Sequence, residues 1–91
     1  MRNKVLLRVF LPATQKSYEF RVPLDLQVED GARLISRILS SRDPVRYEAS
    51  EDVDLMMLDG DEAGAILSPR ETFKWYVQHE WLVDGSHLAL A

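Results

Sequence analysis

The chain contains no cysteine, which excludes disulfide bonds and thiolate metal sites and makes a reducing compartment acceptable. It also lacks a long hydrophobic run. The apolar stretch near the N-terminus is interrupted by Arg8 and is far shorter than a membrane span, so we expect neither a secretory signal nor direct membrane insertion. The chain length suits one domain. We therefore expect a cytoplasmic protein that forms a single domain over residues 1–91.

Basic residues are scarce in the second half of the chain. Residues 1–46 contain nine Lys/Arg and five Asp/Glu, whereas residues 47–91 contain two and ten, so the halves carry +4 and −8. A nucleic-acid-binding domain would present a dominant basic face with aromatic residues for base stacking. This distribution argues against a nucleic-acid partner. It is compatible with electrostatic steering toward a protein partner or a homo-oligomer.

The first half of the sequence predicts a β-hairpin followed by a helix. Alternating apolar and polar residues in KVLLRVFL (4–11) and SYEFRV (17–22) indicate two strands joined by a short loop. Apolar residues recur at helical spacing in VEDGARLISRILSS (28–41), and Pro44 limits any extension of this helix. Gly31 lowers the helix propensity of the segment without removing the pattern.

The second half predicts two short strands, a helix and a final strand. VDLMMLD (53–59) and AIL (65–67) indicate the two strands, with a glycine-containing turn between them. SPRE (68–71) matches a capping box with serine as N-cap, and the apolar side of the following helix continues to Trp81. The last strand is SHLALA (86–91). We expect these elements to bury a common core: Val5, Leu7, Phe20, Val22, Ile35, Leu55, Leu67, Leu88 and Leu90.

The element order β-β-α-β-β-α-β resembles the ubiquitin-like, β-grasp arrangement, an α+β fold with a mixed sheet and one main helix across it. GAIL (64–67) and VDGSHLAL (83–90) resemble the ending of that family, where a short strand, a brief helix and a glycine turn precede the last strand. The second helix departs from the pattern by being about one turn longer.

Within this fold the chain resembles the small YukD/EsaB proteins of Gram-positive bacteria. Those proteins are stand-alone ubiquitin-like domains associated with the Esx-type (type VII) secretion system. The resemblance implies a non-enzymatic accessory module whose partner is a larger protein, such as a membrane component of the secretion machine. An interaction domain of an unrelated bacterial complex is the alternative within the same functional class.

A small-group carrier, of the ubiquitin or sulfur-carrier type, is a function of a different class. Such relatives use a flexible C-terminal Gly-Gly, because only glycine permits close approach inside an activating enzyme. This sequence ends in LALA (88–91) and has no glycine after Gly85, which disfavours carrier chemistry unless the natural chain is longer.

Motifs for catalysis or metal binding are incomplete. DGDEAG (59–64) resembles a calcium loop, but Arg70 stands where the loop requires glutamate. His79-Glu80 lacks the second histidine of a zinc-protease helix, since Val83 occupies that position. No nucleophile motif or phosphate loop is present. We therefore expect no enzyme activity, no metal and no cofactor.

Two sets of residues are candidates for binding a protein. The first is the sheet face opposite the helix, where strand alternation places four apolar residues: Leu6, Phe10, Met56 and Leu58. The alternative is that the second helix or the loop around Tyr47 covers them. Met56 lies roughly where the main recognition patch of ubiquitin is centred. Contiguous exposed apolar surface is typical of an interface.

The second set is basic and surrounds the first helix: Arg33, Arg37, Arg42 and Arg46. These residues could bind an acidic partner or the acidic stretch 48–62 of another copy. The alternative is an ordinary solvated helix face, which is what charge runs usually form. Trp75 is a further candidate, either as an exposed anchor or as part of a helix–loop contact.

Overall fold

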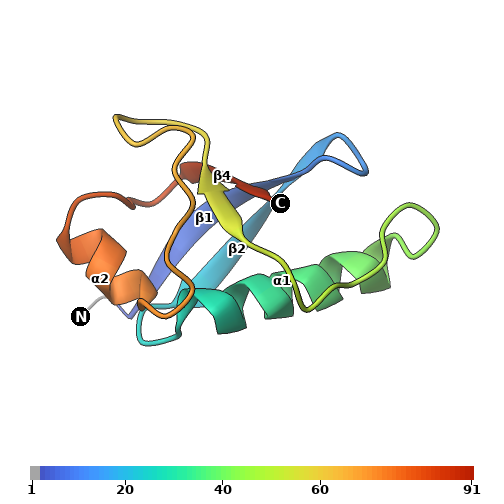
Figure 1. Cartoon of the computed structure of the whole chain (residues 1–91), viewed down its shortest axis with the longest axis horizontal. Helices are drawn as coiled ribbons and strands as arrows, with labels where there is room; N and C mark the ends of the chain where they lie inside the picture. The colour runs from blue at the N-terminus through green and yellow to red at the C-terminus, as the bar shows by residue number, and fades with distance from the viewer. Residues whose placement is uncertain (1–2) are drawn as a thin grey trace.

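A mixed four-stranded sheet with one long helix across it forms the body of the molecule (Figure 1). The computed structural model describes residues 3–91. The sheet order is β2-β1-β4-β3, with β1 and β4 parallel at the centre and antiparallel pairs on both sides. The α+β class expected from the sequence is confirmed. The elements in chain order are β1 (Lys4–Leu11), β2 (Lys16–Pro23), α1 (Val28–Arg42), β3 (Leu55–Met57), α2 (Phe73–Gln78) and β4 (Ser86–Leu90).

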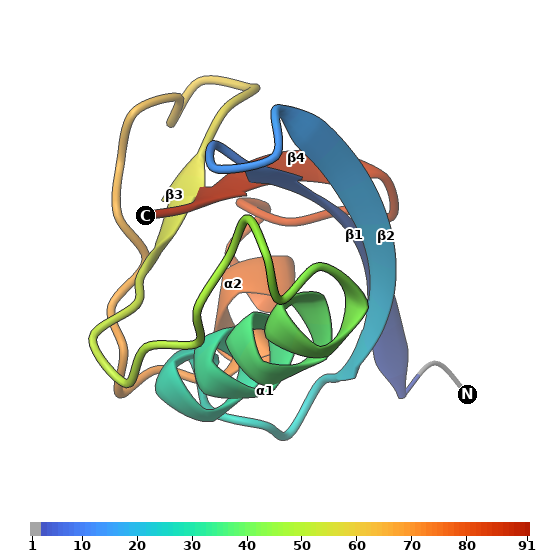
Figure 2. The same cartoon turned by 90° about the vertical axis from the view of Figure 1, so that its right-hand side faces the viewer.

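Helix α1 covers one face of the sheet, called here the inner face (Figure 2). Its buried side follows the predicted spacing and includes Ala32, Ile35 and Leu39. Gly31 is also buried, and a Cβ atom there would lie 2.5 Å from Cε2 of the Phe73 ring. The glycine that weakens the helix in the sequence therefore makes room for an aromatic ring of α2.

The predicted core is correct except at one position. Eight of the nine expected residues are buried, and Phe20 is partly buried and packs against the core. Phe20 lies on β2, which is an edge strand, so one side of its ring lacks a neighbouring strand. Leu82, which the sequence patterns did not single out, is fully buried beside the others.

The start of α2 differs from the prediction. Ser68 is not its N-cap: the helix begins at Phe73, and the hydroxyl of Thr72 accepts a hydrogen bond from the backbone N–H of Trp75. The carbonyls of Pro69 and Glu71 instead accept hydrogen bonds from the N–H groups of Glu29 and Val28 at the start of α1. The N-cap residue of α1, Gln27, provides no side-chain cap, so this backbone contact satisfies N–H groups that a helix leaves unpaired.

The lengths of three predicted elements also need correction. Helix α2 ends at Gln78, so the expectation that it continues to Trp81 is wrong; Glu80 follows with a positive φ of 63°. The strand expected at 53–59 is regular only over Leu55–Met57. The strand expected at 65–67 is reduced to an isolated bridge between Met56 and Ile66. Among residues 3–91, no helix has the length and apolar character needed to cross a bilayer.

Candidate functional site

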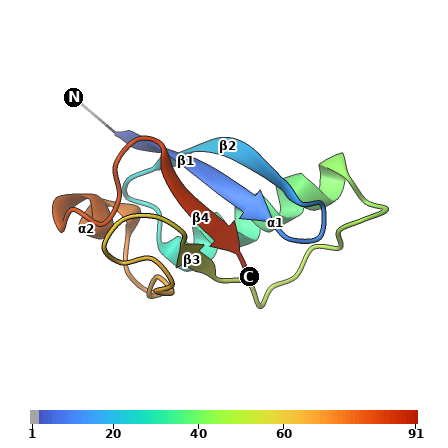
Figure 3. The ribbon, with the colours of Figure 1, turned by 90° about the horizontal axis from the view of Figure 1, so that it is seen from above.

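The sheet face opposite α1, called here the outer face, is not covered by a helix. In Figure 3, β1 and β4 lie in front of α1. The expected alternation is correct, because Leu55 and Met57 are 0% and 1% exposed and Met56 between them is partly exposed. The two segments that could have covered the outer face pack on the α1 side. Tyr47 bonds to Ser36 of α1, and Phe73 of α2 contacts Gly31.

An apolar row crosses three strands on the outer face. Phe10 is paired with Ala89, Ala89 with Met56, and Met56 with Ile66, and paired residues on neighbouring strands point to the same face. These four residues define the apolar row. Ile66 is 57% exposed, Phe10 and Met56 are partly exposed, and Ala89 is buried between its larger neighbours. The sequence missed Ala89 and Ile66 because their positions depend on strand register.

A polar row runs beside the apolar row. Arg8 is paired with His87, whose carbonyl accepts a 2.8 Å hydrogen bond from the N–H of Leu58. The backbone N–H of His87 donates to Oδ2 of Asp59 over 3.1 Å, and its Nε2 lies 3.0 Å from Oγ of Ser17. All three contacts of His87 are therefore made with neighbouring residues of the same chain.

Two of the four predicted patch residues lie outside the apolar row. Leu58 is 37% exposed and lies next to it, at the end of the polar row. Leu6 is partly exposed but is separated from Phe10 by Arg8 along β1. Leu6 is paired with Arg21, and its N–H donates to Oδ1 of Asp84. The structure thus brings Phe10, Met56 and Leu58 together and places Leu6 apart.

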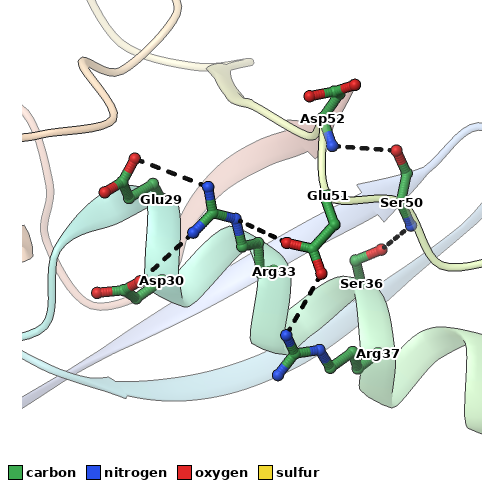
Figure 4. Close-up of polar contacts among 8 residues, drawn as sticks. All are labelled: Glu29, Asp30, Arg33, Ser36, Arg37, Ser50, Glu51 and Asp52. Atoms are coloured by element: carbon green, nitrogen blue, oxygen red, sulfur yellow. Dashed lines mark hydrogen bonds and ion pairs between the residues drawn. The ribbon is translucent and has the colours of Figure 1, made fainter.

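Two of the four predicted basic residues share one acidic residue of the same chain, Glu51 (Figure 4). Nε of Arg33 lies 3.4 Å from Oε2 of Glu51, and an NH2 nitrogen of Arg37 lies 3.5 Å from Oε1 of the same carboxylate. Arg33 also contacts Glu29 and Asp30 at 4.0 and 3.8 Å. The sequence placed both arginines on a solvated face, but the segment after α1 returns over that face and neutralises them.

The other two basic residues lie at the end of α1. Arg46 is 3.4 Å from Asp43, and Arg42 makes no ion pair with any of the residues the structure describes. The four arginines therefore do not form one free basic surface. The segment between α1 and β3 is also held by buried Ser36, whose Oγ lies 2.6 Å from the hydroxyl of Tyr47. The same Oγ accepts a hydrogen bond from the N–H of Ser50 (Figure 4).

The remaining candidates make structural contacts. Trp75 is 36% exposed and stacks on His79, with ring centroids 3.8 Å apart. Nδ1 of His79 lies 2.7 Å from the carbonyl oxygen of Trp75. Gly60 and Gly64 have positive φ values, as tight turns require, in the segment that resembles a calcium loop. Within residues 3–91, no group of three or more His, Cys, Asp or Glu side chains is arranged to hold a metal ion.

Solved structures with a similar backbone identify the fold. The N-terminal ubiquitin-like domain in the 4931431F19Rik protein matches with a TM-score of 0.67 and 21% identity, over 100% of this chain and 76% of that chain. A designed protein based on ubiquitin matches with a TM-score of 0.61 and 16% identity, over 100% and 90%. The chain therefore has a ubiquitin-like fold.

A third match comes from a secretion complex. A chain of the MycP5-free ESX-5 inner membrane complex, State II, is similar with a TM-score of 0.74 and 16% identity. The match covers 99% of this chain and 21% of that chain, so this chain spans about a fifth of the larger protein. No family model matches the sequence, and no curated protein matches it.

Proposed function

We propose that the chain is a non-enzymatic protein–protein interaction module that works in the bacterial cytoplasm as an accessory component of a type VII-like secretion system. Two observations support the secretion role: the resemblance of its ending to the YukD/EsaB proteins, and the similarity of its backbone to part of an ESX-5 inner membrane complex chain. The partner is a protein component of that membrane assembly. An interaction domain of an unrelated bacterial complex is the competing assignment.

The observation that carries the interaction role is the apolar row on an uncovered sheet face. Ile66 at 57% exposure and Leu58 at 37% lie beside the partly exposed Met56 and Phe10, so the exposed apolar surface is contiguous. Soluble proteins seldom present such a surface unless something binds there. Methionine and aromatic residues also adapt to and anchor protein contacts. Arg42 is proposed as a secondary electrostatic contact, because Glu51 already pairs with Arg33 and Arg37, and Asp43 pairs with Arg46.

Site-specific crosslinking tests this proposal, because the chain has no cysteine and a single introduced cysteine can carry a photo-crosslinker. Ile66→Cys places the label on the apolar row. Leu34→Cys is the matched control, since Leu34 is a 47% exposed apolar residue on α1. In cells of the native host, we expect the label at 66 to capture a secretion-complex subunit and the label at 34 to capture none.

A second substitution tests whether the outer face makes the contact, whichever complex the captured protein belongs to. Met56→Asp should abolish the adduct from the label at 66, because docking would bury its carboxylate in an apolar contact. Capture that persists with Met56→Asp would contradict the assignment of the outer face. Capture of a subunit from an unrelated complex would leave the outer face in place and reject the secretion role.

A further inference from the structure

Strand β2 forms an open edge of the sheet. It has eight residues and pairs with β1 on one side, and among residues 3–91 no strand pairs with its other side (Figure 2). We propose that β2 of a second copy pairs there in antiparallel orientation, centred on Phe20, so that one sheet runs through both copies. This inference goes beyond the proposed function, because it concerns the edge of the sheet and leaves the outer face uncovered.

Half of the backbone groups of β2 point out of this edge. The N–H of Leu24, directly after β2, donates to the carbonyl of Asn3, directly before β1, over 2.9 Å, and so points toward β1. Backbone groups of successive residues in a strand point to opposite sides, which directs those of Ser17, Glu19 and Arg21 away from β1. A row of unpaired N–H and C=O groups is a template on which another strand can add.

The side chains of β2 select the register with a second copy. Tyr18, Phe20 and Val22 share the inner face with the core residues of β1 opposite them, so the pairing must keep these residues together. Pairing centred on Phe20 places Glu19 of each copy opposite Arg21 of the other, twice in each dimer. Centring on Glu19 or on Arg21 would instead place like charges opposite each other, and centring on Tyr18 would pair neither charge with an opposite one. Cross-strand pairs of opposite charge stabilise a sheet, and like charges oppose pairing.

Glu19 and Arg21 are both exposed, and neither makes an ion pair with another residue in the described part of the chain. Arg8 stands opposite Glu19 on β1, so the new pairing would continue an alternation of charge across the strands, from Arg8 to Glu19 and then to Arg21 of the second copy. Charged residues protect many sheet edges from their own copies. Here opposite charges lie symmetrically about Phe20, so two copies attract each other.

Apolar side chains lie beside this edge on the α1 side. Ser36 holds the segment that follows α1 through hydrogen bonds. Leu34 and Ile38 are each two residues from Ser36, a spacing that places them on the opposite side of the helix, which faces β2 in Figure 2. Leu34 is 47% exposed, and Ile38 and Phe20 are partly exposed. A second copy at the edge would remove part of this apolar surface from water, which favours pairing.

Pairing of this kind would join two binding surfaces. The two-fold axis would stand perpendicular to the sheet, so both α1 helices would lie on one side and both outer faces on the other. A dimer would therefore present two apolar rows on the same side. A partner that carries two docking segments would bind such a dimer more tightly than a monomer, because its second segment would bind within the same complex.

Sedimentation velocity from micromolar to millimolar concentration tests the proposal. The wild-type chain should form dimers, because a two-fold contact closes on itself. Glu19→Arg and Arg21→Glu should each weaken dimerisation by roughly tenfold or more, since each change turns two attractive contacts into repulsive ones. Glu48→Arg is the matched control, because it changes an exposed glutamate on the segment that follows α1, and it should have no effect. A monomer at every concentration overturns the proposal, as does a dimer that neither change at the edge weakens.

Recombining the two changes tests the register. An equimolar mixture of the Glu19→Arg and Arg21→Glu chains should form dimers again, because both contacts between unlike chains are then attractive. A chain that carries both changes should also dimerise. Both residues are exposed, so circular dichroism should show that each variant is folded. A mixture or a double variant that stays monomeric rejects the pairing centred on Phe20.

Amide hydrogen exchange locates the contact. In the dimer the N–H groups of Glu19 and Arg21 would bond to the second copy, so their exchange should slow as the concentration rises. The N–H groups of Tyr18 and Phe20 point toward β1 and should be protected at every concentration, which provides a control within the same strand. Protection that rises with concentration elsewhere, and not at Glu19 and Arg21, would place the contact on another surface and overturn the proposal.

The results separate this inference from the proposed function. Met56→Asp changes the outer face and should leave the dimer intact, and loss of the dimer in this variant would place the contact on the outer face instead. A monomeric chain that still crosslinks a partner through position 66 retains the proposed function and rejects pairing at β2. A chain that dimerises through β2 but captures no partner through position 66 retains this inference and rejects the proposed function.

Discussion

The two faces of the sheet both carry apolar side chains, but different groups cover them. On the inner face Val5, Leu7 and Val9 are fully buried under α1. On the outer face Phe10 and Met56 stay partly exposed between their strand neighbours, and no helix of the described residues 3–91 covers them (Figure 3). Burial of apolar area stabilises a fold in proportion to the area removed from water. The inner face therefore holds the chain together, whereas the outer face contributes little to folding and is available for binding.

The adjacent residues Met56 and Met57 allow the sharpest test of this contrast. They are the same residue type, next to each other, and point to opposite faces of the sheet. Met57→Asp should lower the free energy of unfolding by about 4 kcal/mol or more, because it buries a carboxylate without a partner. Met56→Asp should lower it by less than about 1 kcal/mol, because its carboxylate can reach water.

Urea denaturation of the two variants at neutral pH gives both free energies. A chain with Met57→Asp that folds nearly as well as the wild type would show that β3 is not part of the cooperative core. An unfolded Met56→Asp variant would show that the outer face also stabilises the monomer, and the contrast between the faces would be lost.

Gly31 tests how tightly the inner face is covered. In an ordinary helix interior, Gly→Ala stabilises by roughly 0.5–1 kcal/mol. Here the added Cβ would lie 2.5 Å from the ring of Phe73, which is 0% exposed, so the ring would have to shift within the packed core. We expect Gly31→Ala to destabilise the fold by about 1–3 kcal/mol, as overpacking of a core does.

A double-mutant cycle identifies the cause. Phe73→Leu removes the ring atoms that the new Cβ would meet, so Gly31→Ala should cost much less in the Phe73→Leu background. Equal costs in both backgrounds would assign the effect to the helix itself. In that case the contact between α1 and α2 would not be the reason that glycine occupies position 31.

The sequence predicted elements whose patterns are local. The hairpin and α1 follow from alternation and helical spacing, and the buried apolar residues of α1 lie at the expected helical spacing. The start of α2 was wrong because a tertiary contact overrides a strong local signal. SPRE matches a capping box, but the carbonyls of Pro69 and Glu71 bond to the first turn of α1 and hold the segment out of a helix. No pattern within residues 68–71 encodes that contact.

The candidate sites likewise divide into features that local patterns predict and features that depend on contacts between distant residues. Alternation predicted which side of the sheet Phe10 and Met56 occupy, but joining them to Ala89 and Ile66 requires the strand register. Register depends on pairings between residues far apart in the chain, which a single sequence does not display. The acidic partner of Arg33 and Arg37 could not be predicted for a related reason. Glu51 reaches Arg33 and Arg37 because the segment after α1 turns back over the helix.

The smallest effect is expected for the ion pairs on the solvent side of α1. The Glu51 side chain, which contacts Arg33 and Arg37, is 74% exposed. Ion pairs between solvent-exposed side chains stabilise a fold by at most about 1 kcal/mol. Glu51→Ala should therefore lower the free energy of unfolding by less than about 1 kcal/mol in low salt, and high salt should remove most of that difference. Urea denaturation at both salt concentrations measures it, with Glu48→Ala as a control that removes a neighbouring acidic residue without an observed ion pair. A loss above about 2 kcal/mol that persists in high salt would mean that this carboxylate, rather than the apolar side of α1, keeps the inner face covered.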